Sequence, residues 1–141
     1  MKEIKEYIYN RLVSDATLQA LLGATGNDKR VYHLGAEVDY EVNEKKKGFI
    51  IYYTNQGAQT DELDSQTLPP ISVTFDVYAN SWNDAELISA QIDVLFPVIL
   101  DFSTTNYRCF NIRKENRIDG LPSDIGAKRF TVRFRLSSII K

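Results

Sequence analysis

The sequence predicts an α+β fold in which a single antiparallel or mixed β-sheet carries two main helices packed on one face. Apolar residues recur at three- and four-residue steps near the N-terminus, which is typical of an amphipathic helix. Ile71 to Ala79 alternates apolar and polar residues, as an antiparallel strand with one buried face does. A second amphipathic helix and two further strands follow. One sheet with helices on one side buries all of these apolar stripes together.

Length and composition predict one ordinary globular domain spanning residues 1–141. The chain has 141 residues, 43% of them hydrophobic, which is enough to bury a core without disulfides or a metal. The net charge of −2 disfavours a nucleic-acid binder. The N-terminus lacks the uninterrupted apolar core of a secretory signal, and the longest apolar run, Val94 to Leu100, is too short to cross a bilayer. We therefore expect a protein that stays in solution, without a membrane partner.

The first half of the chain predicts two short helices and two strands. Ile4, Ile8 and Leu12 share one face of the N-terminal helix, and Ser14 or Asp15 caps a second helical stretch over 16–22 that ends at Gly23. Residues 31–34 form a short candidate strand. The charged segment 39–47 is expected to be an exposed loop, and the β-branched and aromatic residues of 49–54 predict a strand.

The second half predicts a long polar loop, a strand, a helix and two strands. Residues 55–68 are polar and acidic, and an ordered connection of this length is often functional. The helix is expected to begin at Asn83, with Glu86 completing a capping box. Its predicted buried stripe includes Ile99, with a kink or break at Pro97. The final strands are predicted over 107–113 and 129–138.

We find no catalytic or cofactor-binding motif in the sequence. His33 is the only histidine, so one chain cannot form a histidine-based metal cluster. His33 paired with Asp39 or Glu41 as a general base is the catalytic alternative to a structural histidine. Cys109 is the only cysteine, so it forms no disulfide within the chain, and we interpret it as a buried hydrophobic residue of a protein in a reducing cytoplasm. A nucleophile pair with His33 depends on the two meeting in the fold.

Two further segments resemble ligand-binding motifs only superficially. Gly23-Ala-Thr-Gly26 lacks the Lys-Ser/Thr of a phosphate-binding loop and the preceding strand, so we interpret it as a helix C-cap followed by a turn. Asp61, Glu62 and Asp64 have the chemistry of Ca²⁺ or Mg²⁺ ligands, but their spacing does not fit an EF-hand. The alternatives are a solvated acidic loop and a loop that docks on a partner. We predict neither a metal nor a cofactor.

The last strand places Arg129, Arg133 and Arg135 on one face of the predicted sheet. With Arg108 and Arg113 on a possible neighbouring strand, they would give the sheet a basic outer face. Three interpretations remain open: a solvated face, a subunit interface in which arginines meet carboxylates such as Asp61 or Glu62 of a neighbour, and a nucleic-acid contact. Tyrosine and arginine are both enriched in protein interfaces.

Three stretches of the chain carry a family resemblance: Tyr9 to Gly23 with Arg30 to Ala36, the strand at Gly48 to Gly57, and above all ISVTFDVYANSWNDAELISAQI at 71–92. In these stretches the sequence resembles the tail-completion, or tail-terminator, proteins of long-tailed bacteriophages and prophages. Pro97 and the long segment 111–128 depart from the family's usual pattern.

The resemblance implies a non-enzymatic virion structural protein that assembles in the cytoplasm of a bacterial host and resides in the virion tail. Such proteins form a ring, commonly of six subunits, that caps the tail tube and presents a surface for head joining. The implied partners are other copies of the chain, the tail-tube protein and the head–tail connector protein. A head–tail connector, or neck protein, is the structural alternative. A small enzyme and a nucleic-acid-binding domain are the alternatives of another class.

Overall fold

The computed structural model describes residues 2–56, 69–121 and 127–141. Three helices and six strands follow one another along these residues: α1 (Lys2–Val13), α2 (Ala16–Leu22), β1 (Val31–His33), β2 (Gly48–Gln56), β3 (Ile71–Ala79), α3 (Trp82–Leu95), β4 (Phe102–Ser103), β5 (Tyr107–Leu121) and β6 (Lys128–Ile140). The fold is α+β, as the sequence predicts, and α1 and α3 are the two longest helices.

The six strands form one mixed sheet in the order β1-β2-β3-β6-β5-β4. β1 runs parallel to β2, and the other neighbours are antiparallel. β3 lies at the centre, where Phe75 pairs with Tyr52 of β2 and with Val132 of β6. The parallel pair at one edge makes the sheet mixed, one of the two arrangements expected from the sequence.

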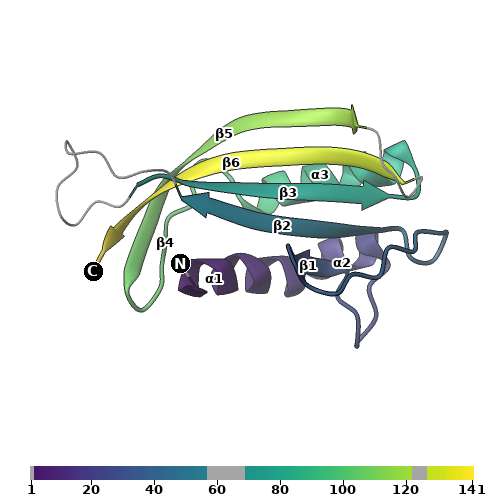
Figure 1. The fold of residues 1–141 in the computed structure, drawn as a ribbon, viewed down its shortest axis with the longest axis horizontal. Coiled ribbons are helices and arrows are strands. Elements are labelled where there is room, and N and C mark those ends of the chain that lie inside the picture. Colours follow the sequence, from purple (N-terminus) through teal and green to yellow (C-terminus); the bar gives the residue numbers. More distant parts are fainter. Residues whose placement is uncertain (1, 57–68, 122–126) are drawn as a thin grey trace.

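The helices cover one face of the sheet and close the hydrophobic core (Figure 1). α1 contributes Ile4, Ile8 and Leu12, which are all at most 1% exposed, in agreement with the predicted stripe. All five alternate apolar residues of β3 point into this core and are fully buried. Phe75, Phe96 and Phe134 pack their rings at centroid distances of 5.3–5.5 Å. The core therefore lies between the central strands and α3.

The turn after α2 requires glycine for two reasons. Gly23 has a φ of 70°, and its N–H donates to the Ala20 carbonyl, so it ends the helix in the left-handed conformation. A Cβ at this position would lie 1.9 Å from the Lys45 carbonyl oxygen. Asp15 caps the same helix by accepting a hydrogen bond from the Leu18 N–H. Both ends of α2 agree with the prediction.

α3 breaks before Pro97, as the sequence predicts, but its N-cap and the extent of its buried stripe differ from the prediction. Its N-cap is Ser81, which accepts a hydrogen bond from the Asp84 N–H, and not Asn83, which lies within the first turn and is exposed. The helix ends at Leu95, before Pro97, because proline cannot continue the backbone hydrogen bonds. Ile99 consequently leaves the helical stripe and is 86% exposed instead of buried.

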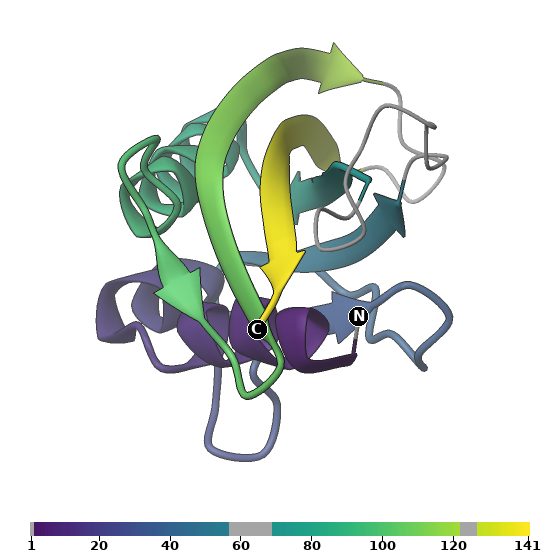
Figure 2. The same ribbon diagram turned by 90° about the vertical axis from the view of Figure 1, so that its left-hand side faces the viewer.

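β5 and β6 form a hairpin that is longer than the two strands predicted. Much of the segment 111–128 belongs to β5, and the pairing with β6 shifts register at three places. In Figure 2 both strands bow, with the open side of the bow directed away from α3. β4 pairs only with Arg108 and Cys109, so the rest of β5 forms an edge of the sheet within the described part of the chain.

Candidate functional site

The catalytic pairs that the sequence left as alternatives do not assemble in the described part of the chain. Asp39 accepts hydrogen bonds from the Arg30 guanidinium at 3.1 Å and the Lys46 ammonium at 2.9 Å, and Glu41 also binds Lys46. The hydrogen bond from Lys46 is the main reason why the pKa of Asp39 lies below its usual value. His33 instead packs edge-on against the Tyr52 ring at 5.3 Å. The structural interpretation of His33 therefore fits the contacts that it makes.

Cys109 is a fully buried thiol on the helix-facing side of β5. Burial raises its pKa to about 11, so the thiol is protonated at neutral pH and is a poor nucleophile. β6, β3 and β2 separate its strand from β1, which carries His33. The pair considered from the sequence is not formed.

Asp61, Glu62 and Asp64 lie outside the described residues, so their predicted role as an interface loop stays a prediction. Within the ranges that the structure describes, no group of three or more His, Cys, Asp or Glu side chains is arranged to hold a metal ion. The same ranges contain no helix that is both long and apolar enough to span a membrane.

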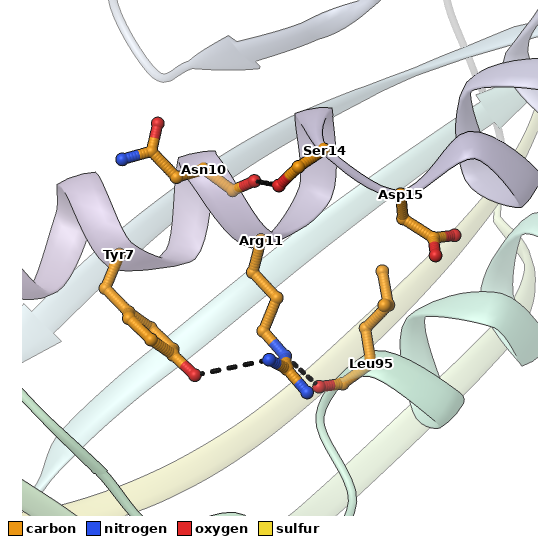
Figure 3. A pocket seen from close by; sticks show the side chains of 6 residues that line it. All are labelled: Tyr7, Asn10, Arg11, Ser14, Asp15 and Leu95. Atoms are coloured by element: carbon orange, nitrogen blue, oxygen red, sulfur yellow. Dashed lines mark hydrogen bonds between the residues drawn. The ribbon is translucent and has the colours of Figure 1, made fainter.

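A hollow of about 410 Å³ lies between α1 and the end of α3 (Figure 3). The polar side chains that line it make contacts between helices. Arg11 donates from Nε to the Leu95 carbonyl at 2.5 Å and from Nη1 to the Tyr7 hydroxyl at 3.4 Å. A cation at the C-terminus of α3 satisfies a free carbonyl and favours the helix dipole. Asp15 joins the N-terminus of α2 to α3 through Gln91. The polar side chains of this hollow therefore connect helices to one another, and we assign them a structural role.

The predicted arginine row lies on the face of the sheet opposite the helices. Phe130, Val132 and Phe134 alternate with it along β6 and point into the core. The pairing of Arg113 with Arg135 places the exposed Arg113 of β5 on the same outer face. The row and its β5 neighbour therefore form a basic face, which we define by Arg113, Arg129, Arg133 and Arg135. Arg108, the other β5 arginine expected on this face, pairs with Asp101 at 3.0 Å.

The arginines of this face differ in their surroundings. Arg129 lies 3.4 Å from the carboxylate of Asp76 and over the Tyr78 ring, so its charge is balanced within the chain. Arg133 is half-buried and donates to the Thr74 hydroxyl at 3.3 Å. Arg135, like Arg113, is exposed. The exposed positive charge is thus concentrated toward the end of the row at Arg135.

Asp76 and two threonines are buried on the outer face, although the alternation along β3 predicts a solvent-facing side. Thr74 and Thr131 are 2% and 5% exposed, and Asp76 is 8% exposed. The Thr131 hydroxyl donates to the Asp76 carboxylate at 2.8 Å. The Thr74 hydroxyl in turn accepts a hydrogen bond from Arg133, so these buried polar groups have partners on the outer face.

A second feature, which the sequence analysis did not single out, is an exposed apolar stripe on α3 and the turn that follows. We define the α3 stripe by Leu87, Val94, Val98 and Ile99, which are 44%, 65%, 58% and 86% exposed. Leu87 and Val94 are seven residues apart and therefore share the solvent-facing side of the helix. For Leu87 and Val94 the signal was present in the sequence, because both fall outside the helical face that contains Ile88 and Ile92. Ile99 falls on that face by periodicity and is exposed because the helix ends at Leu95.

The buried Arg30 is also absent from the predicted site. Its side chain is 1% exposed and donates to the carbonyls of Gly48 and Glu41, at 3.0 and 2.6 Å, as well as to Asp39. It also lies over the Phe49 ring, 5.5 Å from the centroid. Arg30 attaches the connection 34–47 to the start of β2, so we assign it a structural role.

The complete fold is similar to that of two solved proteins. A chain from the virion of a native gene transfer agent particle matches with a TM-score of 0.71 over 95% of this chain and 92% of its own length, at 14% sequence identity. A second solved protein, whose name describes no activity, matches with a TM-score of 0.54 over 100% and 96% of the two chains, at 15% identity. No protein-family model and no curated protein sequence matches the chain. At these identities the comparisons establish a shared fold.

Proposed function

We propose that this chain is a structural subunit of a phage-like virion and acts without catalysing a reaction. The observation that carries the proposal is the fold shared, over nearly its whole length, with a component of a gene transfer agent virion. The resemblance of residues 9–92 to tail-completion proteins points in the same direction. The contacts of His33, Asp39 and Cys109 are those of structural residues.

Within that class, the proposed role is that of a tail terminator. Its subunits form a ring at the end of the tail tube, stop further growth of the tube and provide the surface for head joining. A closed ring requires each subunit to present two different surfaces that complement each other. The basic face and the α3 stripe are two such surfaces, and they lie on opposite sides of the sheet.

Deleting the gene in the strain that produces the particles tests this role. Loss of a terminator leaves tube growth unchecked, so electron micrographs should show tails of variable and excessive length, detached from heads. Mass spectrometry of purified wild-type particles should detect the chain.

Two other outcomes would contradict the terminator role. Unattached tails of normal length would indicate the head–tail connector alternative instead. Normal, infectious or DNA-transferring particles from the deletion strain would exclude both structural roles. Restoring the gene from a plasmid provides the control for effects on neighbouring genes.

A further inference from the structure

A second hollow, of about 350 Å³, lies between the N-terminal half of α1 and the strands β1 and β2. α1 runs alongside these strands on the helix side of the sheet (Figure 1). The helix lines the hollow with residues spaced three and four apart, which share one of its sides, and the strands contribute His33 and Tyr52. The volume is near the lower end of the range for ligand sites, which suits one residue of a partner.

Three aromatic rings form the apolar wall of this hollow. His33 lies opposite Tyr52 in the parallel pair of strands, so both side chains point to the helix side. The His33 ring stands edge-on to the Tyr52 ring at 5.3 Å, and the Tyr9 ring is tilted against it at 6.5 Å. A wall of this kind favours an apolar or aromatic side chain.

The Tyr52 hydroxyl is a hydrogen-bond donor without an acceptor among the described residues. Its side chain is only 4% exposed. Burial, and to a smaller extent Tyr9, raises the pKa of Tyr52, so the hydroxyl keeps its proton at neutral pH. A buried hydroxyl without an acceptor is destabilising, so a ligand that supplies one gains a hydrogen bond here.

The ionised side chains of the hollow carry a net positive charge. Lys2 pairs with Glu6 at 3.8 Å, and their charges offset each other. Lys5, which is half-buried, pairs with no carboxylate in the described part of the chain. Glu3 is engaged elsewhere, because it accepts a hydrogen bond from the Asn106 N–H at 3.3 Å. The charge that remains is that of Lys5, which favours an anionic ligand.

We propose that this hollow, defined by Lys5, Tyr9, His33 and Tyr52, docks the C-terminus of a partner protein whose last residue is bulky and apolar. The terminal carboxylate accepts hydrogen bonds from Lys5 and Tyr52, and the last side chain packs against the aromatic wall. Only at a C-terminus do a main-chain carboxylate and an apolar side chain leave the same Cα. The proposal goes beyond the virion role and does not depend on it.

Short glycine–serine peptides test the occupant by NMR titration of the ¹⁵N-labelled chain. The reference peptide ends in phenylalanine with a free carboxylate and should shift the backbone signals of Tyr9, His33 and Tyr52. The same peptide with a C-terminal amide should bind about tenfold more weakly, because it loses charge-assisted hydrogen bonds. A peptide that ends in glycine should also bind about tenfold more weakly, because no side chain contacts the rings.

Variants of the chain assign the two polar contacts. Tyr52→Phe removes only the hydroxyl and should weaken binding of the reference peptide about fivefold, and Lys5→Gln should weaken it about tenfold. The matched controls are Tyr53→Phe, on the other face of the same strand, and Lys29→Gln, at an exposed lysine outside the hollow. Both controls should bind like wild type.

Thermal unfolding separates a docking role of the Tyr52 hydroxyl from a purely structural one. Since the hydroxyl has no acceptor among the described residues, Tyr52→Phe should unfold at or above the wild-type temperature. A lower melting temperature would show that the hydroxyl serves the fold, and would contradict its assignment to a ligand.

Two further probes distinguish a chain terminus from other sources of a carboxylate: 3-phenylpropionate, and an amidated peptide with an internal glutamate beside phenylalanine. Either one binding as tightly as the reference peptide would overturn the assignment to a C-terminus. No binding of the reference peptide at about 10 mM, or wild-type affinity in either hollow variant, would overturn the site itself. Tail length in the deletion strain does not depend on these titrations, so failure of the docking site and failure of the virion role are separable.

Discussion

At the scale of single residues, Arg30 shows how one side chain organises a long connection. Its φ of 58° is in the left-handed region, which costs a non-glycine residue about 1 kcal/mol. The backbone N–H of Arg30 donates a hydrogen bond to the Asp28 carboxylate. The Arg30 guanidinium donates to four acceptors on 39–48, which are three backbone carbonyls and the Asp39 carboxylate. One of these acceptors, the Gly48 carbonyl, belongs to a buried residue, so the contacts offset the backbone strain.

Replacing Arg30 should separate the stabilising effect of its side-chain contacts from the cost of its strained backbone. Arg30→Ala removes the side-chain contacts and keeps the strained backbone, so we expect the free energy of unfolding to fall by about 3 kcal/mol. Arg30→Gly removes the same contacts and relieves the strain, so it should be about 1 kcal/mol less destabilising than the alanine variant. Urea unfolding followed by circular dichroism measures both. Equal stability of the two variants would show that the strain at this residue is negligible.

At the scale of elements, α3 both contributes to the core and displays the exposed stripe. Ser81 determines where the helix begins, because its side chain accepts a hydrogen bond from the Asp84 N–H at 3.1 Å. Pro97 and the Arg11 contact to the Leu95 carbonyl determine where it ends. The chain then continues through Val98 and Ile99, which extend the apolar surface beyond the helix.

The position of this helix start can be tested by paired substitutions. Ser81→Ala removes the cap and should lower the free energy of unfolding by about 1 kcal/mol, whereas Ser81→Asp should preserve it. Asn83→Ala, at the cap position expected from the sequence, should change stability by less than about 0.5 kcal/mol because Asn83 is exposed. If Asn83→Ala lowered the stability more than Ser81→Ala, the result would support Asn83 as the N-cap, as predicted from the sequence. Denaturant titrations of the three variants provide the comparison.

At the scale of the whole molecule, the basic face and the α3 stripe lie on opposite sides of the sheet. This arrangement suits a contact that repeats from one subunit to the next. On the outer face, Asp76 balances the charge of Arg129, whereas the side chains of Arg113 and Arg135 are exposed to solvent. We propose that Asp61, Glu62 and Asp64 add further carboxylates to assembly. Their sequence places them between β2 and β3, and β3 pairs with β6 of the basic hairpin.

Neutralising this acidic segment should separate folding from assembly. We expect Asp61→Asn, Glu62→Gln and Asp64→Asn together to leave the melting temperature unchanged, because charges in a polar loop contribute little to stability. Self-association or binding to tail tubes should weaken if the segment docks on a neighbour. Glu37→Gln with Glu44→Gln, at exposed carboxylates of another connection, is the control. Unchanged assembly of the triple variant would exclude the segment from the interface.

The sequence by itself determined the class of each main element and the side that it buries. The alternation along β3 and the spacing of Ile4, Ile8 and Leu12 report the period of the backbone, which is a local property. Asp15 and Gly23 likewise mark the ends of α2 through contacts within a few residues. The outward direction of the arginine row follows in the same way from the alternation of apolar and polar residues along β6.

Only the tertiary structure decided which of these outward groups are still available to a partner. Asp76 meets Thr131 and Arg129 across two strands, and Arg30 reaches carbonyls of a connection that follows it by about ten residues. The exposed side of α3 is likewise defined by the sheet that covers the other side. These relations depend on how distant segments are brought together, so no local period encodes them.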